Sequence, residues 1–233
     1  MTTTQTDIEA IKQAIRQLSR VEREGLAEWV LDVSMFEPRL EETALAYGGP
    51  CRVTVEEFLE LDGKDGVRYE YMAGQIFAMS TPLIRHGVIA TNLMVHFQEQ
   101  LRGGPCRAWP SNTAVRLQVN REDIFYIPDV MVACGPLTED VLDQQYLTNP
   151  CVVVEVLSAS TEAIDRREKA LNYRHLPSLE EYLLVAQRSM EVTVFRRSEG
   201  WVPRVLTAPQ DVFESRAVEV RLVLADIYEG ARG

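Results

Sequence analysis

The 233-residue sequence lacks the features that mark membrane, secreted and zinc-binding proteins. No apolar run approaches the roughly 18 to 20 residues that span a bilayer, and the opening MTTTQTDIEAIKQAIRQ has no apolar core of the signal-peptide kind. The four cysteines are widely spaced and form no C-x-x-C pair, so neither a zinc site nor a disulfide framework is indicated. We therefore expect a cytoplasmic protein without a membrane partner, whose thiols are reduced and mostly buried.

Positive charge is also scarce. The formal net charge of -11 argues against the broad basic surface that is typical of nucleic-acid-binding proteins. Residues 1–62 hold 13 acidic and 6 basic side chains, however, so the rest of the chain is closer to neutral. Many bases lie in one span, namely Arg166, Arg167, Lys169, Arg174, Arg188, Arg196, Arg197 and Arg204. A local cationic face is therefore compatible with the composition.

The chain is 46% hydrophobic and long enough for one full core with an appendage. Apolar residues recur at three-to-four spacing in the first 45 residues, which predicts two short helices with a narrow apolar stripe. Gly48, Gly49 and Pro50 then form a plausible boundary. We expect an N-terminal helical extension over residues 1–47 and a main domain over residues 48–233.

The main domain shows alternating signals for strands and helices. TVEEFLEL predicts a helix capped by Thr54 with Glu57 three positions on, and apolar spacing predicts a second helix from His86 to Leu101. A third helix is predicted in STEAIDRREKALNYRHL, before Pro177. Two strands around a turn at Gly74 are expected in VRYEYMAGQIFAMS, and further strands in NTAVRLQV, IFYIPDVMVA, CVVVEVLSAS, EYLLVA and MEVTVFRR, with a loop over GPLTEDVLDQQYLTNP. This order predicts an α/β fold with a mixed β-sheet flanked by helices.

Glu155 is a single carboxylate inside the apolar run CVVVEVL. Such a group is costly to bury, so it should have a partner. Asp129, in the apolar segment FYIPDVMVA, is the first candidate, and a divalent cation between the two acids would remove their repulsion. Mg²⁺ and Mn²⁺ take oxygen ligands of this kind. The alternative is that each acid ends its strand at the surface.

Two further segments of the sequence contain charged residues that could belong to the same site. Glu70, between aromatic residues in RYEYM, is a third acid of the same sort, although it would also suit the outer face of a hairpin. Asp165, Lys169 and Tyr173 recur every four residues and therefore share one face of the predicted helix after Glu155. That face could line a site or be solvated.

Several blocks resemble, in order, those of the Uma-two family: YEYMAGQIFAMS, HGVIATNLMVHF, IPDVMVA, VVVEVLSAS followed by DRREKALNYR, and EYLLVA with MEVTVFRR. The resemblance covers roughly residues 52 to 230, and ordered blocks are more specific than one short motif. This family comprises restriction-endonuclease-like proteins of the PD-(D/E)xK superfamily. The resemblance therefore implies a restriction-endonuclease-like mixed sheet flanked by helices.

The resemblance also assigns roles to the acids. Asp129 would be the acid of the PD element, Glu155 the second acid, 26 residues later, and Glu70 the residue that completes the metal shell. A metal held in this way gathers positive charge against a phosphodiester and lowers the pKa of a bound water. Mg²⁺ or Mn²⁺ is the expected cofactor.

The lysine of the superfamily motif is displaced in this sequence. Two residues after Glu155 stands Leu157, whereas Lys169 fits the position that the family uses on the following helix. Asp165 and Tyr173 match the same block and would support the site or the substrate. His86, in RHG, matches a family histidine that would touch phosphate or hold a carboxylate; a packing or helix-capping histidine is the alternative.

These residues predict a metal-dependent endonuclease that hydrolyses phosphodiester bonds of DNA and acts as a homodimer. The alternative is a catalytically inactive nuclease-fold binding or regulatory module, associated with toxin–antitoxin systems or mobile elements. The acidic charge and the missing strand lysine favour this alternative. A hydrolase with Glu70 and Glu155 as an acid and base pair has only residue type in its support.

Overall fold

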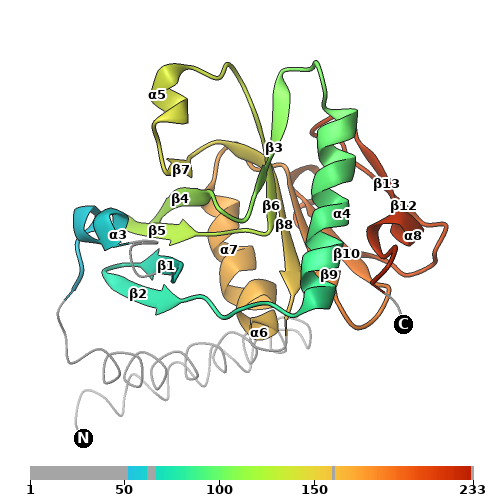
Figure 1. Ribbon diagram of the computed structural model, residues 1–233, viewed down its shortest axis with the longest axis horizontal. Helices are drawn as coiled ribbons and strands as arrows, with labels where there is room; N and C mark the ends of the chain where they lie inside the picture. The colour runs from blue at the N-terminus through green and yellow to red at the C-terminus, as the bar shows by residue number, and fades with distance from the viewer. Residues whose placement is uncertain (1–51, 62–66, 159–160, 232–233) are drawn as a thin grey trace, which may run out of the picture. The chain divides into compact units, whose positions relative to one another are not determined.

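The computed structural model describes residues 52–61, 67–158 and 161–231 (Figure 1). The predicted N-terminal helical extension, residues 1–47, lies outside the described residues, as does Cys51. Within the described ranges, no helix is long and apolar enough to cross a membrane.

A six-stranded sheet forms the centre of the domain. Its strand order is β11-β10-β9-β8-β6-β3, and β8 and β9 are parallel whereas the other neighbours are antiparallel. The strands are β3 (Cys106–Pro110), β6 (Val130–Cys134), β8 (Pro150–Leu157), β9 (Glu181–Ala186), β10 (Val192–Arg196) and β11 (Arg204–Leu206). The valine-rich β8 lies inside this sheet, where both of its faces are covered, as its near-continuous apolar sequence predicts.

A second sheet has five strands in the order β2-β1-β5-β4-β7. The strands are β1 (Tyr69–Met72), β2 (Gln75–Ala78), β4 (Ala114–Val119), β5 (Glu122–Tyr126) and β7 (Tyr146–Leu147). The predicted hairpin turn at Gly74 joins β1 to β2, and Gly74 takes a positive φ there. A third, two-stranded sheet pairs β12 (Val212–Glu214) with β13 (Arg221–Val223).

Helices cover both faces of the six-stranded sheet (Figure 1). The long helix α4 (Ile84–Gln100) lies on one face, and an irregular helix over residues 162–175 lies on the other, beside the five-stranded sheet. That irregular helix consists of α6 (Glu162–Ile164), a π-helical turn (Asp165–Lys169), α7 (Ala170–Asn172) and a 3-10 turn (Tyr173–His175). Short helices elsewhere are α3 (Val55–Leu61), α5 (Glu139–Leu142), a 3-10 turn (Arg197–Glu199) and α8 (Leu224–Ile227).

Alternation along β8 determines which face each side chain meets. Val152, Val154 and Val156 pack into the core beneath α4, whereas Val153 packs into the core beside the irregular helix. Glu155 therefore points to the side of the irregular helix, where it lies buried. The predicted α/β fold, with mixed sheets flanked by helices, is confirmed.

The predicted capping box at α3 is also confirmed. The backbone N–H of Glu57 donates to Thr54 Oγ1 at 3.2 Å, and the N–H of Thr54 donates to Glu57 Oε2 at 2.8 Å. Phe58, one residue later, is buried against the five-stranded sheet. The cap thus fixes the start of the helix that closes this side of the core.

Three sequence-based predictions of local structure need correction. The segment IFYIPDVMVA is not one interrupted strand, because β5 ends at Tyr126 in one sheet and β6 begins at Val130 in the other. The helix after Glu155 contains a π-helical turn that its α-type periodicity does not reveal. Strand β3 was not predicted, and the expected loop before β8 contains α5 and β7.

The expectation of reduced cysteines is wrong for one pair. Cys106 and Cys134 form a disulfide, although 28 residues separate them. The antiparallel register of β3 and β6 makes them direct cross-strand partners, a contact that sequence spacing cannot show. Cys151 is the unpaired cysteine of the described residues.

Candidate functional site

The candidate site centres on the buried ammonium group of Lys169. Lys169 Nζ lies 2.7 Å from Glu70 Oε1, 3.2 Å from Glu155 Oε1 and 3.4 Å from Asp165 Oδ1. Glu155, Asp165 and Lys169 are at most 4% exposed. Three acids that the sequence suggested for one site therefore meet around the cation Lys169.

These four residues come from three elements of the fold. Glu70 lies on β1 of the five-stranded sheet and Glu155 on β8 of the six-stranded sheet. Asp165 and Lys169 occupy the two ends of the π-helical turn, and both are buried. The hydroxyl of Tyr182 donates to the Asp165 carbonyl at 2.9 Å, which holds this turn against β9. A π-helical turn often marks a functional position in a helix.

Tyrosines surround the charged centre. The Tyr173 hydroxyl donates to Glu155 Oε1 at 3.0 Å, as its shared helical face with Lys169 suggested. The ammonium of Lys169 also lies 5.2 Å from the centre of the Tyr126 ring, within cation–π range. The Tyr126 hydroxyl donates to Glu168 at 2.8 Å and so ties β5 to the helix. Sequence analysis missed Tyr126 and Tyr182, because nothing in their local pattern distinguishes them from core aromatics.

Asp129, which directly precedes β6, contacts the C-terminal end of the neighbouring strand β8. Its Oδ2 accepts a 2.7 Å hydrogen bond from the backbone N–H of Val156, the residue after Glu155. The same oxygen is 3.2 Å from His86 Nε2, which is provided by the first turn of α4. Asp129 is thus bound to the residue of β8 that follows Glu155, so the two candidate acids lie near each other. His86 contacts the carboxylate of Asp129, which was one of its two predicted roles.

Burial and mutual repulsion raise the pKa values of two acids of this site, Glu155 and Asp165. Burial raises the pKa of Glu155 well above its usual value, and the charges of Asp165, Asp129 and Glu70 add to the effect, while Lys169 opposes it. Burial also raises the pKa of Asp165, against the opposing charge of Lys169. These carboxyl groups consequently hold protons more tightly than they would in water.

Neighbouring acids raise the pKa values of the two basic groups, Lys169 and His86. Burial alone would lower the pKa of Lys169, but the charges of Glu155, Glu70 and Asp165 outweigh it and raise that pKa. Burial likewise opposes the protonated form of His86, yet the hydrogen bond and charge of Asp129 raise its pKa overall. Lys169 is therefore a permanent cation at neutral pH.

Acidic side chains outnumber basic ones around this centre. Four carboxyl groups, those of Glu70, Asp129, Glu155 and Asp165, face the cation Lys169 and the titratable His86. The buried Oδ1 of Asp165 has no hydrogen-bond partner among the described residues. Such an excess is expensive to bury and favours the binding of a further cation.

No cluster of three or more histidine, cysteine, aspartate or glutamate side chains is arranged as a metal site within the described ranges. Lys169 instead contacts Glu70 and Glu155, two of the predicted ligands. The residues present nevertheless suit a divalent metal ion in their chemistry. Carboxylate oxygens are suitable ligands for a hard divalent cation, and such a cation would neutralise the excess of acidic groups. The donors thus fit Mg²⁺ or Mn²⁺ in type and in charge.

Comparisons with known proteins connect this chain to a family. The chain is 34% identical over 180 residues to the uncharacterized protein slr1290 of Synechocystis sp., a match that covers 77% of this chain and 93% of that relative. A second uncharacterized protein of the same organism, sll1609, is 26% identical over 145 residues, which cover 62% of this chain and 81% of that relative.

A crystal structure of a protein from Anabaena variabilis, described as a putative nuclease belonging to DUF820, has the same fold. The TM-score is 0.62 at 20% sequence identity, and the match covers 77% of this chain and 99% of that one. The model of the Uma2 family, described as "Putative restriction endonuclease", matches residues 55–225. The chain therefore belongs to the Uma2 family.

Proposed function

We propose that this protein is a metal-dependent endonuclease that hydrolyses phosphodiester bonds of DNA. The observation that carries the proposal is the buried, acid-rich centre at the end of β8, where Glu155 and the Asp129-bound N–H of Val156 are adjacent. Its family and fold are described as those of nucleases. An excess of buried carboxylates has a chemical purpose in such an enzyme, because a cation must neutralise both the acids and the phosphate.

Asp129 and Glu155 would hold Mg²⁺ or Mn²⁺, and Glu70 would complete the shell. When bound, the ion supplies charge against the phosphate oxygens and lowers the pKa of a water molecule that attacks phosphorus. Glu155, whose pKa is raised, would lose its proton as the ion binds, since a ligand must be deprotonated.

The side chains around the acids would prepare the centre for the substrate. Lys169, held as a cation by three acids, would orient the attacking water or stabilise charge that develops on the phosphate. Tyr173 holds Glu155 through the 3.0 Å hydrogen bond, which fixes the direction of its carboxylate. His86 and the N–H of Val156 do the same for Asp129. Positioning of this kind is the usual contribution of neighbouring residues.

A nicking assay tests the proposal. Supercoiled plasmid is incubated with the purified full chain and Mg²⁺ or Mn²⁺, and with the isosteric variants Asp129→Asn and Glu155→Gln. We expect each variant to lose at least about 100-fold in rate, as expected when charge stabilisation at a reacting centre is removed. Asp123→Asn is the control, because Asp123 pairs with Arg116 in the other sheet. Equal cutting by all three variants would assign the activity to another site or to a contaminant.

Substrate and assembly are tested with the same preparations. We propose DNA as the substrate and a homodimer as the active form, because two sites can cut two strands. Light scattering should give twice the chain mass, and RNA should compete less effectively than DNA for the site. Cutting of RNA at the same rate would widen the substrate class.

A second candidate function is nucleic-acid binding without cleavage. It is favoured by the position of Lys169, whose ammonium already contacts Glu70 and Glu155 in the place of an added cation. Under this alternative, DNA would shift in a gel without being nicked, and Mn²⁺ would leave the melting temperature unchanged. A Mn²⁺-dependent melting shift that is lost in Glu155→Gln would exclude it.

A further inference from the structure

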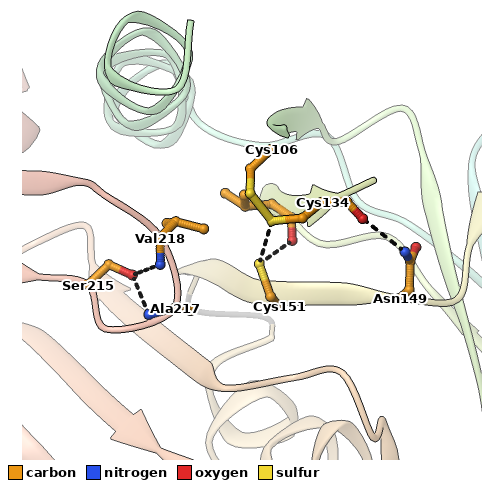
Figure 2. Close-up of a disulfide and its surroundings, with 8 residues drawn as sticks. Cys106, Cys134, Asn149, Cys151, Ser215, Ala217 and Val218 are labelled. Atoms are coloured by element: carbon orange, nitrogen blue, oxygen red, sulfur yellow. Dashed lines mark hydrogen bonds between the residues drawn. A yellow bond between two sulfur atoms is a disulfide. The ribbon is translucent and has the colours of Figure 1, made fainter. Parts of the chain in front are cut away.

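Three cysteine sulfurs lie next to one another in the six-stranded sheet (Figure 2). Cys106 of β3 is bonded to Cys134 of β6, and the thiol sulfur of Cys151 on β8 lies 3.7 Å from Cys134 Sγ. The Cys151 thiol also donates to the Val132 carbonyl at 3.3 Å, which directs the sulfur toward β6. Figure 2 shows Cys151 beside the bonded pair.

A bulge in β8 brings Cys151 to this position. Val152 and Val153 face opposite sides of the sheet, so strict alternation would put Cys151 on the side of Val153. The register with β6 passes from Val152 directly to Pro150, which leaves Cys151 unmatched in that ladder. Bulges re-aim side chains in this way. As a result, Cys151 packs on the α4 side, together with Cys134.

We propose that Cys106, Cys134 and Cys151 form a thiol–disulfide exchange site in which Cys134 bonds to either neighbour. The Cys151 thiolate attacks Cys134 Sγ, the bond between Cys134 and Cys106 breaks, and Cys106 leaves as a thiolate. Cys106 then takes up the proton that Cys151 released. One disulfide and one thiol exist before and after the step, so no external oxidant is required.

The order of the strands makes Cys134 the obligatory partner. Strand β6 lies between β3 and β8, so the strands that carry Cys106 and Cys151 are two spacings apart, about 10 Å. A disulfide requires Cα atoms within about 7 Å. Cys106 and Cys151 therefore cannot bond to each other while the sheet is intact.

Exchange would move the cross-link between strands. The Cys106–Cys134 bond ties the edge strand β3 to β6, whereas a Cys134–Cys151 bond would tie β6 to β8. Asp129 precedes β6 and Glu155 lies on β8, four to five residues from these cysteines, which is roughly 13–17 Å along an extended strand. The exchange site is thus separate from the acidic centre and does not depend on the proposed nuclease function.

Exchange should be slow at neutral pH. Burial raises the pKa of Cys151 to about 11, and the charges of Glu181 and Glu180 contribute to the increase. The attacking thiolate is therefore rare at neutral pH. Below the pKa, the thiolate fraction increases about tenfold for each unit by which the pH increases.

Cysteine variants test the pairing in the full chain, all with Cys51→Ser as a common background. After incubation with oxidised glutathione at pH 8.5 and alkylation, peptides are mapped by mass spectrometry without reduction. Cys106→Ser should form a Cys134–Cys151 disulfide, whereas Cys134→Ser should form no intramolecular disulfide. Alkylation of both cysteines in Cys106→Ser, or a Cys106–Cys151 bond in Cys134→Ser, would overturn the proposal.

Protein that retains Cys106, Cys134 and Cys151 provides a second test, with Cys151→Ser as its control. Protein with a single disulfide is held at pH 7 or pH 10, quenched with acid and alkylated, and the free thiol is assigned. Both Cys106 and Cys151 should be found free at pH 10, with slower interconversion at pH 7, and Cys151→Ser should keep the Cys106–Cys134 bond alone. A free thiol at Cys151 alone, at both pH values and all times, would refute exchange.

Discussion

Lys169 and Arg196 are both cations in the protein interior, but the charges around them differ. Lys169 lies within 3.4 Å of oxygens from three acids, namely Glu70, Glu155 and Asp165. Arg196 donates through Nε to a single buried acid, Glu181, at 2.8 Å. Its other contacts are the Glu214 carbonyl and the less buried Glu199.

The two clusters also differ in how completely their acids are bonded. Glu181 accepts hydrogen bonds from Arg196, from the Ser215 hydroxyl and from the Arg216 N–H, so both of its oxygens are used. This pair connects β9 and β10 to the segment that follows β12. A buried pair of one acid with one base, in which both oxygens of the acid accept hydrogen bonds, is typical of a structural role, whereas acids that outnumber the bases and have raised pKa values are typical of a functional site.

The same substitution in both clusters should have unequal effects, and this is the largest difference that we expect. Glu181→Gln should lower the free energy of unfolding by about 3 kcal/mol, because it leaves Arg196 buried without its carboxylate. Near pH 5, Glu155→Gln should change it by less than about 1 kcal/mol, since it removes one of several crowded acids. Urea unfolding measures both values. Equal losses would mean that both clusters are structural.

The second-largest difference between the two clusters should appear in the stabilisation of the protein by added Mn²⁺. At a concentration 100 times its dissociation constant, a ligand specific for the folded state stabilises it by about 2.7 kcal/mol. We expect this gain in the unmodified protein and in Glu181→Gln, and no gain in Glu155→Gln. Thermal unfolding with and without Mn²⁺ provides the measurement, and a shift that persists in Glu155→Gln would place the ion elsewhere.

The pH dependence of stability should differ in sign from that of an ordinary ion pair. Because the pKa of Glu155 is raised in the folded state, that state binds its proton more tightly than the unfolded chain does. Its contribution to stability is present at low pH and is lost as the pH rises from about 4.5 through the raised pKa, at up to about 1.4 kcal/mol per pH unit. Glu155→Gln should flatten this slope in urea unfolding at pH 5 to 8. An unchanged slope would contradict the assigned shift.

The smallest change in the free energy of unfolding is expected at the exposed capping box of α3. Thr54→Ala removes the hydroxyl that caps α3 and should cost about 1 kcal/mol at every pH. Thr54→Ser is the matched control, because it keeps the capping oxygen. A loss as large as that of Glu181→Gln would show that α3 contributes to the core through more than its cap.

Residues of the acidic centre could be predicted because their signals are local. Glu155 is conspicuous in a valine-rich strand, and the four-residue spacing of Asp165, Lys169 and Tyr173 indicates one helical face. The capping box and the turn at Gly74 depend on neighbouring residues in the same way. These local signals single out individual residues, but only the resemblance to the family indicated that the acids and Lys169 share one site.

Features that depend on pairing between distant segments could not be predicted. The disulfide depends on the register of β3 and β6, and the position of Cys151 depends on a bulge against β6. Tyr126 joins the site through the packing of one sheet against the helix. Such contacts are set by tertiary structure, which overrides what a short window of sequence can report.

Glu70 and Glu155 come from different sheets, and Lys169 joins them. One of the points where the chain crosses from the five-stranded to the six-stranded sheet lies immediately before β6, at Asp129. A partly folded or incompletely synthesised chain, in which the sheets have not yet docked, would lack an assembled centre. If the protein cuts DNA, the cell would thus be protected from its nascent copies until folding is complete.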